Sequence, residues 1–126
     1  MKLRIKGNSL RLRLGPTEVE RLLAAGRIEE TIRFAPEQSA TLTYALELTA
    51  SDQDVSLHYE PCEVTVLLSR VQASRWAEGE QVTIAGEVGV GQGNLELLIE
   101  KDFACIDRDD SENVDTFPNP KAGAVC

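Results

Sequence analysis

Aromatic residues are scarce in this chain of 126 residues, which has one Trp, two Tyr and three Phe. Its core must therefore be built mainly from Leu, Val, Ile and Ala. No apolar run approaches the ~20 residues that a helix needs to cross a bilayer. The basic start is also not followed by the uninterrupted apolar stretch of a signal peptide. We therefore expect a cytoplasmic protein without a membrane partner.

Cysteines are few and odd in number: Cys62, Cys105 and Cys126 are widely spaced. Such a set does not predict a disulfide framework, and a reducing cytoplasm is the simpler location. Zinc accepts Cys, His and Asp ligands, so Cys105, Asp107 and Cys126 form a candidate set. The chain has no CxxC or HxxxH spacing, however. No metal site is therefore favoured, and no cofactor is predicted.

Basic residues are outnumbered, and the net charge of −8 argues against a protein that binds nucleic-acid backbones with its whole surface. The distribution is uneven, because residues 1–13 hold five basic residues and no acidic one. The rest of the chain then carries a net charge of −13. A cationic start on an acidic body predicts contact with an acidic protein or a small anionic ligand.

Residues 2–14 alternate apolar and charged side chains, at odd positions as far as Ile5 and at even positions from Leu10. This change of phase indicates either a bulge or a reversal of the chain. A two-residue turn at Gly7-Asn8 suits type II′, in which glycine takes the first central position. The resulting hairpin would set Ile5 opposite Leu10 and would have one apolar face. The other face would carry the basic side chains Lys2, Arg4, Lys6, Arg11 and Arg13.

The remaining pattern predicts an α+β fold. A helix is expected over residues 17–25, with Thr17 and Glu20 as a capping box and Gly26 after its end. A second short helix is expected over residues 70–78. Alternating segments between and after the helices predict a bent, mostly antiparallel sheet of about seven or eight strands. Strands in this number also allow a half-open barrel.

The chain reads as a single domain over residues 1–126, without linkers or internal sequence repeats. Residues 107–126 are expected to form an extended, irregular C-terminal tail, because five acidic residues precede a proline-containing stretch that no helix accommodates. Phe117 is its only large apolar side chain. The tail acids are also the expected intramolecular partners of the hairpin cations, since like charges that face each other across a hairpin need a counter-charge.

Three segments carry a resemblance to a known family. They are MKLRIKGNSLRLRL at residues 1–14, LIEKDFAC at residues 98–105 and DTFPNP at residues 115–120. Over essentially its whole length the chain resembles a family of small, uncharacterised bacterial proteins with no assigned function. The resemblance implies a bacterial, cytoplasmic, single-domain protein and implies no chemistry.

Three functions are compatible with these patterns. The first is a non-enzymatic binding or regulatory module that uses the cationic hairpin face. The second is a phosphate-ester or polyphosphate enzyme, whose cations would point into a cavity beside a metal held by carboxylates. The third is a zinc-stabilised module. Since no nucleophile, base and orienting group occur together, the sequence favours the non-enzymatic module.

Overall fold

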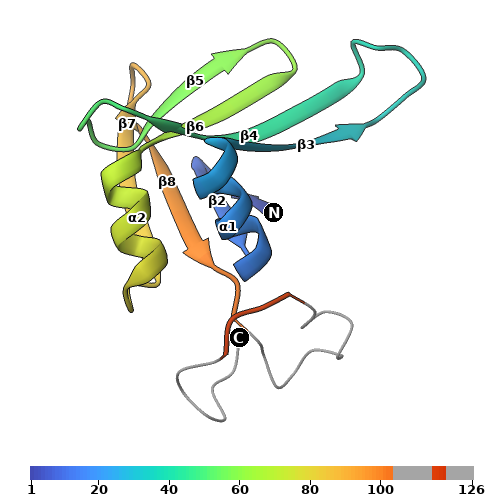
Figure 1. The fold of residues 1–126 in the computed structure, drawn as a ribbon. Coiled ribbons are helices and arrows are strands. Elements are labelled where there is room, and N and C mark those ends of the chain that lie inside the picture. The colour runs from blue at the N-terminus through green and yellow to red at the C-terminus, as the bar shows by residue number, and fades with distance from the viewer. Residues whose placement is uncertain (104–114, 119–126) are drawn as a thin grey trace.

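The computed structural model describes residues 1–103 and 115–118 of the chain. The described residues form eight strands and two helices (Figure 1). In chain order these are β1 (Lys2–Lys6), β2 (Ser9–Leu14), α1 (Pro16–Ala25), β3 (Arg27–Arg33), β4 (Thr41–Thr49), β5 (Ser56–Glu60), β6 (Glu63–Ser69), α2 (Arg70–Glu78), β7 (Thr83–Gly89) and β8 (Asn94–Lys101).

The strands are divided between two four-stranded sheets, with the orders β1-β2-β8-β7 (sheet A) and β3-β4-β6-β5 (sheet B). Each sheet consists of two antiparallel hairpins joined by a parallel central pair, β2 with β8 and β4 with β6. The predicted α+β class and strand number are confirmed. The strands are not one bent sheet, however, and those that the structure describes do not close into a barrel.

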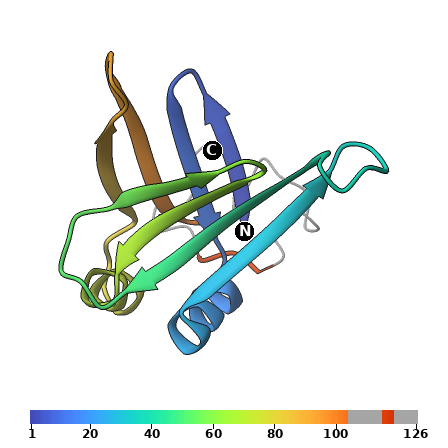
Figure 2. The ribbon, with the colours of Figure 1, turned by 90° about the horizontal axis from the view of Figure 1, so that it is seen from above.

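The core lies between the two sheets and the two helices. Sheet A and both helices lie on the same side of sheet B (Figure 1), and the strands of the two sheets cross at an angle (Figure 2). Leu12 and Ile99 from sheet A are buried with Leu46 and Val66 from sheet B. Trp76 of α2 is fully buried in the same core. As the composition predicts, aliphatic side chains make up most of this core.

The element order ββαββ occurs twice, over β1–β4 and again over β5–β8, although the two halves show no sequence repeat. Each sheet takes its first hairpin from one half and its second from the other. Leu14 at the end of β2 directly precedes Gly15, the N-cap of α1, just as Leu68 directly precedes Ser69, the N-cap of α2. The halves are therefore related by topology, and positions in one can be compared with positions in the other.

Helix α1 begins earlier than the sequence pattern predicts. Pro16 is its first residue and Gly15 its N-cap, and the amide of Gly15 donates to Glu18 Oε1 at 3.1 Å. The predicted capping box of Thr17 with Glu20 is therefore wrong, since proline favours the first helical position and shifts the cap. The predicted end is confirmed, because Gly26 adopts the left-handed conformation with φ 81°.

Candidate functional site

The N-terminal hairpin has the predicted register. Gly7 has φ 55°, and β1 pairs with β2 so that Ile5 lies opposite Leu10 and Arg4 opposite Arg11. The leucines of β2 are buried, while its arginines are only half-buried on the opposite face. The five predicted cations therefore lie together on the outer face of sheet A, which we call the cationic hairpin face; they are Lys2, Arg4, Lys6, Arg11 and Arg13.

The carboxylates of Glu100, in β8, and of Asp102, just after β8, partly neutralise this face. Arg11 and Arg13 both contact Glu100 of β8, with Nε–Oε distances of 3.4 Å and 3.2 Å. Lys2 Nζ lies 2.8 Å from Asp102 Oδ2. In the part of the chain that the structure describes, the counter-charges thus come from β8 and the residue that follows it, and not from the tail acids that the sequence predicts.

Arg4 and Lys6 form no ion pair with any described residue. Together with Ser9 and Arg11 they line a hollow of about 110 Å³. The Ser9 hydroxyl donates to the Lys6 carbonyl at 2.7 Å, which ties the two strands at the turn. A hollow of this size with three cationic side chains fits one carboxylate or phosphate group, which arginine can bind through two parallel hydrogen bonds.

The same outer face changes sign towards its other edge. Glu87 of β7 lies opposite Glu96 of β8 in the register, and both side chains are exposed. The cationic hairpin face therefore occupies only the β1–β2 half of the sheet.

The tail acids predicted as partners of these cations fall mostly outside the described residues; these are Asp107, Asp109, Asp110 and Glu112. Asp115 is described, and its carboxylate accepts from the Thr17 amide at 3.1 Å and from the Thr17 hydroxyl at 2.8 Å. It therefore caps α1 instead of facing the hairpin. Phe117 packs against the core, which confirms its predicted role as an anchor.

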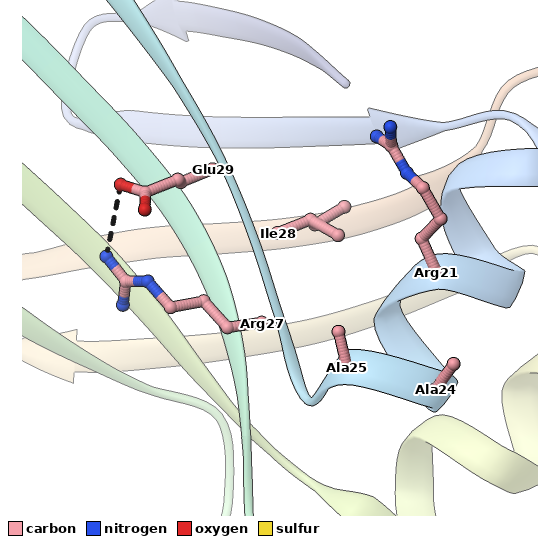
Figure 3. A pocket seen from close by; sticks show the side chains of 6 residues that line it. All are labelled: Arg21, Ala24, Ala25, Arg27, Ile28 and Glu29. Carbon is pink, nitrogen blue, oxygen red and sulfur yellow. Dashed lines mark ion pairs between the residues drawn. The ribbon is translucent and has the colours of Figure 1, made fainter.

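A second hollow, of about 340 Å³, lies between the last turn of α1 and the start of β3 (Figure 3). The guanidinium of Arg27 at its edge contacts Glu63 at 2.7 Å, Glu47 at 3.1 Å and Glu29 at 3.7 Å. Burial alone would lower the pKa of Arg27, but these hydrogen bonds and charges raise it. The positive charge of Arg27 is thus offset by three carboxylates of sheet B.

A third hollow, of about 430 Å³, lies where β8 ends. Its wall includes Lys101, whose side chain is buried and whose Nζ donates to the Gly79 carbonyl at 2.8 Å. The aromatic rings of Trp76 and Phe117 lie 5.9 Å and 5.5 Å from this nitrogen. Burial lowers the pKa of the Lys101 ammonium.

Residues 1–121 match the family of unknown function DUF7009. The chain belongs to the DUF7009 family. This confirms the resemblance to an uncharacterised family that the opening and closing segments carry. Neither curated proteins nor solved structures gave a significant match to the chain.

The predicted metal candidates of this DUF7009 protein, Cys105, Asp107 and Cys126, all lie outside the described residues. Within residues 1–103 and 115–118, no three His, Cys, Asp or Glu side chains are grouped so that they could hold a metal ion. The thiol of Cys62 is exposed and donates to the Ser39 carbonyl at 3.2 Å. Neither helix in this described part is long and apolar enough to cross a membrane.

The sequence interpretation missed Lys101, although the signal was present. Leu95, Leu97 and Ile99 mark the core side of β8 at alternate positions, and Lys101 continues their parity. Because side chains alternate strictly along a strand, this parity alone places a lysine on the buried face.

Proposed function

We propose that this protein is a non-enzymatic binding module that takes an acidic segment of a partner protein on its cationic hairpin face. The observation that supports this most strongly is the hollow formed by Arg4, Lys6 and Arg11, in which two of the three cations have no ion-pair partner among the described residues. Such a site would accept one anionic group at a time, while the flanking cations guide a longer acidic segment along the hairpin.

The arrangement supports binding rather than phosphate-ester or polyphosphate chemistry. The enzyme hypothesis requires cations that point into a cavity with carboxylates free to hold a metal. Here the cations lie on an outward face, and the two carboxylates that contact them, Glu100 and Asp102, each already pair with a cation. Catalysis is therefore not part of the proposal.

As part of the same proposal, the protein acts in the bacterial cytoplasm. The support is the odd, widely spaced set of cysteines together with the exposed free thiol of Cys62. An exposed thiol of this kind persists most readily in a reducing compartment.

The test compares two triple variants by fluorescence polarisation with a labelled oligoglutamate peptide. The first combines Arg4→Gln, Lys6→Gln and Arg11→Gln. The matched control combines Arg21→Gln, Arg33→Gln and Arg75→Gln, which are exposed arginines elsewhere. Both triples remove three positive charges from the starting net charge of −8, so long-range effects are equal.

We expect the hairpin variant to lose binding and the control variant to retain it, with affinity falling as salt is raised. Inorganic phosphate added as a competitor checks whether one small anion fills the hollow. Equal affinity of the wild type and the hairpin variant would refute the proposal.

A further inference from the structure

The side chain of Lys101 is an unusual group for an interior. Lys101 is only 7% exposed, yet no described carboxylate lies within ion-pair distance of its Nζ. A buried charge without a counter-charge is costly, and such groups are retained mainly where they serve a site. The single hydrogen bond to the Gly79 carbonyl uses one of the three ammonium protons.

The other half of the molecule provides an internal comparison. The amide of Lys101 donates to the Val82 carbonyl, in the residue before β7, and the amide of Leu48 donates in the same way to Gly26, in the residue before β3. In the parallel pairs, Lys101 lies beside Leu14 and Leu48 lies beside Leu68. Leu48 is therefore the topological counterpart of Lys101. The fold needs no charge at this position, since the first half fills it with leucine.

Two further features distinguish the second half at this place. Between α2 and β7 it has the residues Gly79 to Val82, whereas Gly26 alone separates α1 from β3. Residues 115–118 also lie against the end of β8, where the Phe117 amide donates to the Asp102 carbonyl at 2.6 Å. Phe103 and Phe117 meet edge to face, with ring centroids 5.8 Å apart. Together these elements form the walls of the 430 Å³ hollow.

The hollow combines an apolar body with one buried cation. Val82 and the rings of Phe103 and Phe117 supply the apolar lining, and Lys101 supplies the charge. The C-terminus of α2 contributes a partial negative charge of about half a unit, which offsets the ammonium only in part. Glu80 also lines the hollow but is exposed to solvent. A residual positive charge in an apolar setting suits a ligand that has an apolar body and one negative charge.

We propose that this hollow binds a small monocarboxylate with an apolar body, such as an aryl- or alkyl-carboxylate. The carboxylate accepts from the two remaining protons of the Lys101 ammonium, and the apolar part lies against the phenylalanine rings. The volume falls in the lower part of the range for small-molecule sites. This site is distinct from the cationic hairpin face and does not depend on the function proposed for it.

The sole tryptophan provides the assay, because the Trp76 ring lies 5.9 Å from the Lys101 nitrogen. The probes are 3-phenylpropionate and its uncharged analogue 3-phenylpropan-1-ol, titrated against Trp76 fluorescence. We expect a saturable change with the carboxylate and at least about tenfold weaker binding of the alcohol. Lys101→Met should weaken binding of the carboxylate by about the same factor and leave binding of the alcohol unchanged.

A second variant keeps the proposal testable if Lys101→Met does not fold. Glu80→Gln removes the rim carboxylate without touching the core, and it should tighten carboxylate binding while leaving the alcohol unaffected. The matched control Glu78→Gln removes a charge from the exposed surface of α2 and should change neither. The inference is overturned if 3-phenylpropionate gives no saturable response at millimolar concentration. It is also overturned if a folded Lys101→Met variant binds 3-phenylpropionate as tightly as the wild type does. The same holds if Glu80→Gln leaves the affinity for 3-phenylpropionate unchanged.

Discussion

Removing the carboxylate of Glu100 should make the cationic hairpin face bind acidic peptides more tightly. Glu100 contacts both Arg11 and Arg13, and so it competes with any anionic partner for the one hollow-lining arginine that is already paired. The variant is Glu100→Gln, which keeps the size of the side chain and removes its charge.

The size of the effect follows from the geometry of the pair. At the 3.4 Å separation of Arg11 and Glu100, unscreened opposite charges in water attract by about 1.2 kcal/mol. The arginine is 28% exposed, and exposed ion pairs of this kind contribute about 0.2–1 kcal/mol once solvent and salt are included. Releasing Arg11 should therefore strengthen peptide binding by about 1.4- to fivefold.

The assay is the polarisation titration with labelled oligoglutamate at low salt. Glu47→Gln is the matched control, because Glu47 pairs with Arg27 at the corresponding place in sheet B and its loss changes the net charge equally. We expect the control to bind as the wild type does. Weaker binding by Glu100→Gln would show that Glu100 orients Arg11 for the partner instead of competing with it, and the reasoning would fail.

Three further changes test the packing and the charges of the fold. Gly15→Ala should lower the free energy of unfolding by about 1–3 kcal/mol in urea denaturation, because the new methyl group would collide with the Asp115 backbone, whereas Gly89→Ala meets no such obstacle. The free energy of unfolding of the wild type should rise relative to that of Lys101→Met as the pH is raised towards 10.5. Burial lowers the pKa of Lys101 in the folded state, so the unfolded chain binds the proton more strongly. Urea midpoints of both proteins at several alkaline pH values check this. Arg27→Met should destabilise the fold by about 1 kcal/mol, and by more at low salt, since it leaves three carboxylates of sheet B without their shared cation. Thermal melts over a series of salt concentrations would contradict this if the variant had the same melting temperature as the wild type throughout.

Local patterns predicted local structure well in this chain. The phase change around Gly7 allows either a bulge or a reversal, and once the chain reverses there, a two-residue turn fixes the register that the hairpin has. The apolar phase also shifts near Pro61, which in the sequence allows either a turn or one long bulged strand; the structure has the turn between β5 and β6, where Cys62 has φ 69°. Such features depend on neighbours in the sequence, and the sequence contains the information directly.

Long-range partners were not predictable in the same way. Strand β8 pairs in parallel with β2, so Leu12 lies beside Ile99, and nothing in either pattern names the other strand. The division into two sheets depends on this choice of partner. The same limit applies to the candidate site. The cations of the hairpin could be predicted from the sequence, but their contacts with Glu100 and Asp102 could not, because these depend on the pairing of β8 with β2.

The exchange of hairpins between the two halves has a consequence for synthesis on the ribosome. Strand β2 lies at the centre of sheet A, yet its second neighbour is β8, the last in chain order of the strands that the structure describes. Until residues 94–101 have left the exit tunnel, one edge of β2 has no partner and its leucines have no complete cover. The open edge of β2 in the nascent first half is therefore expected to be able to pair with other strands until residues 94–101 emerge.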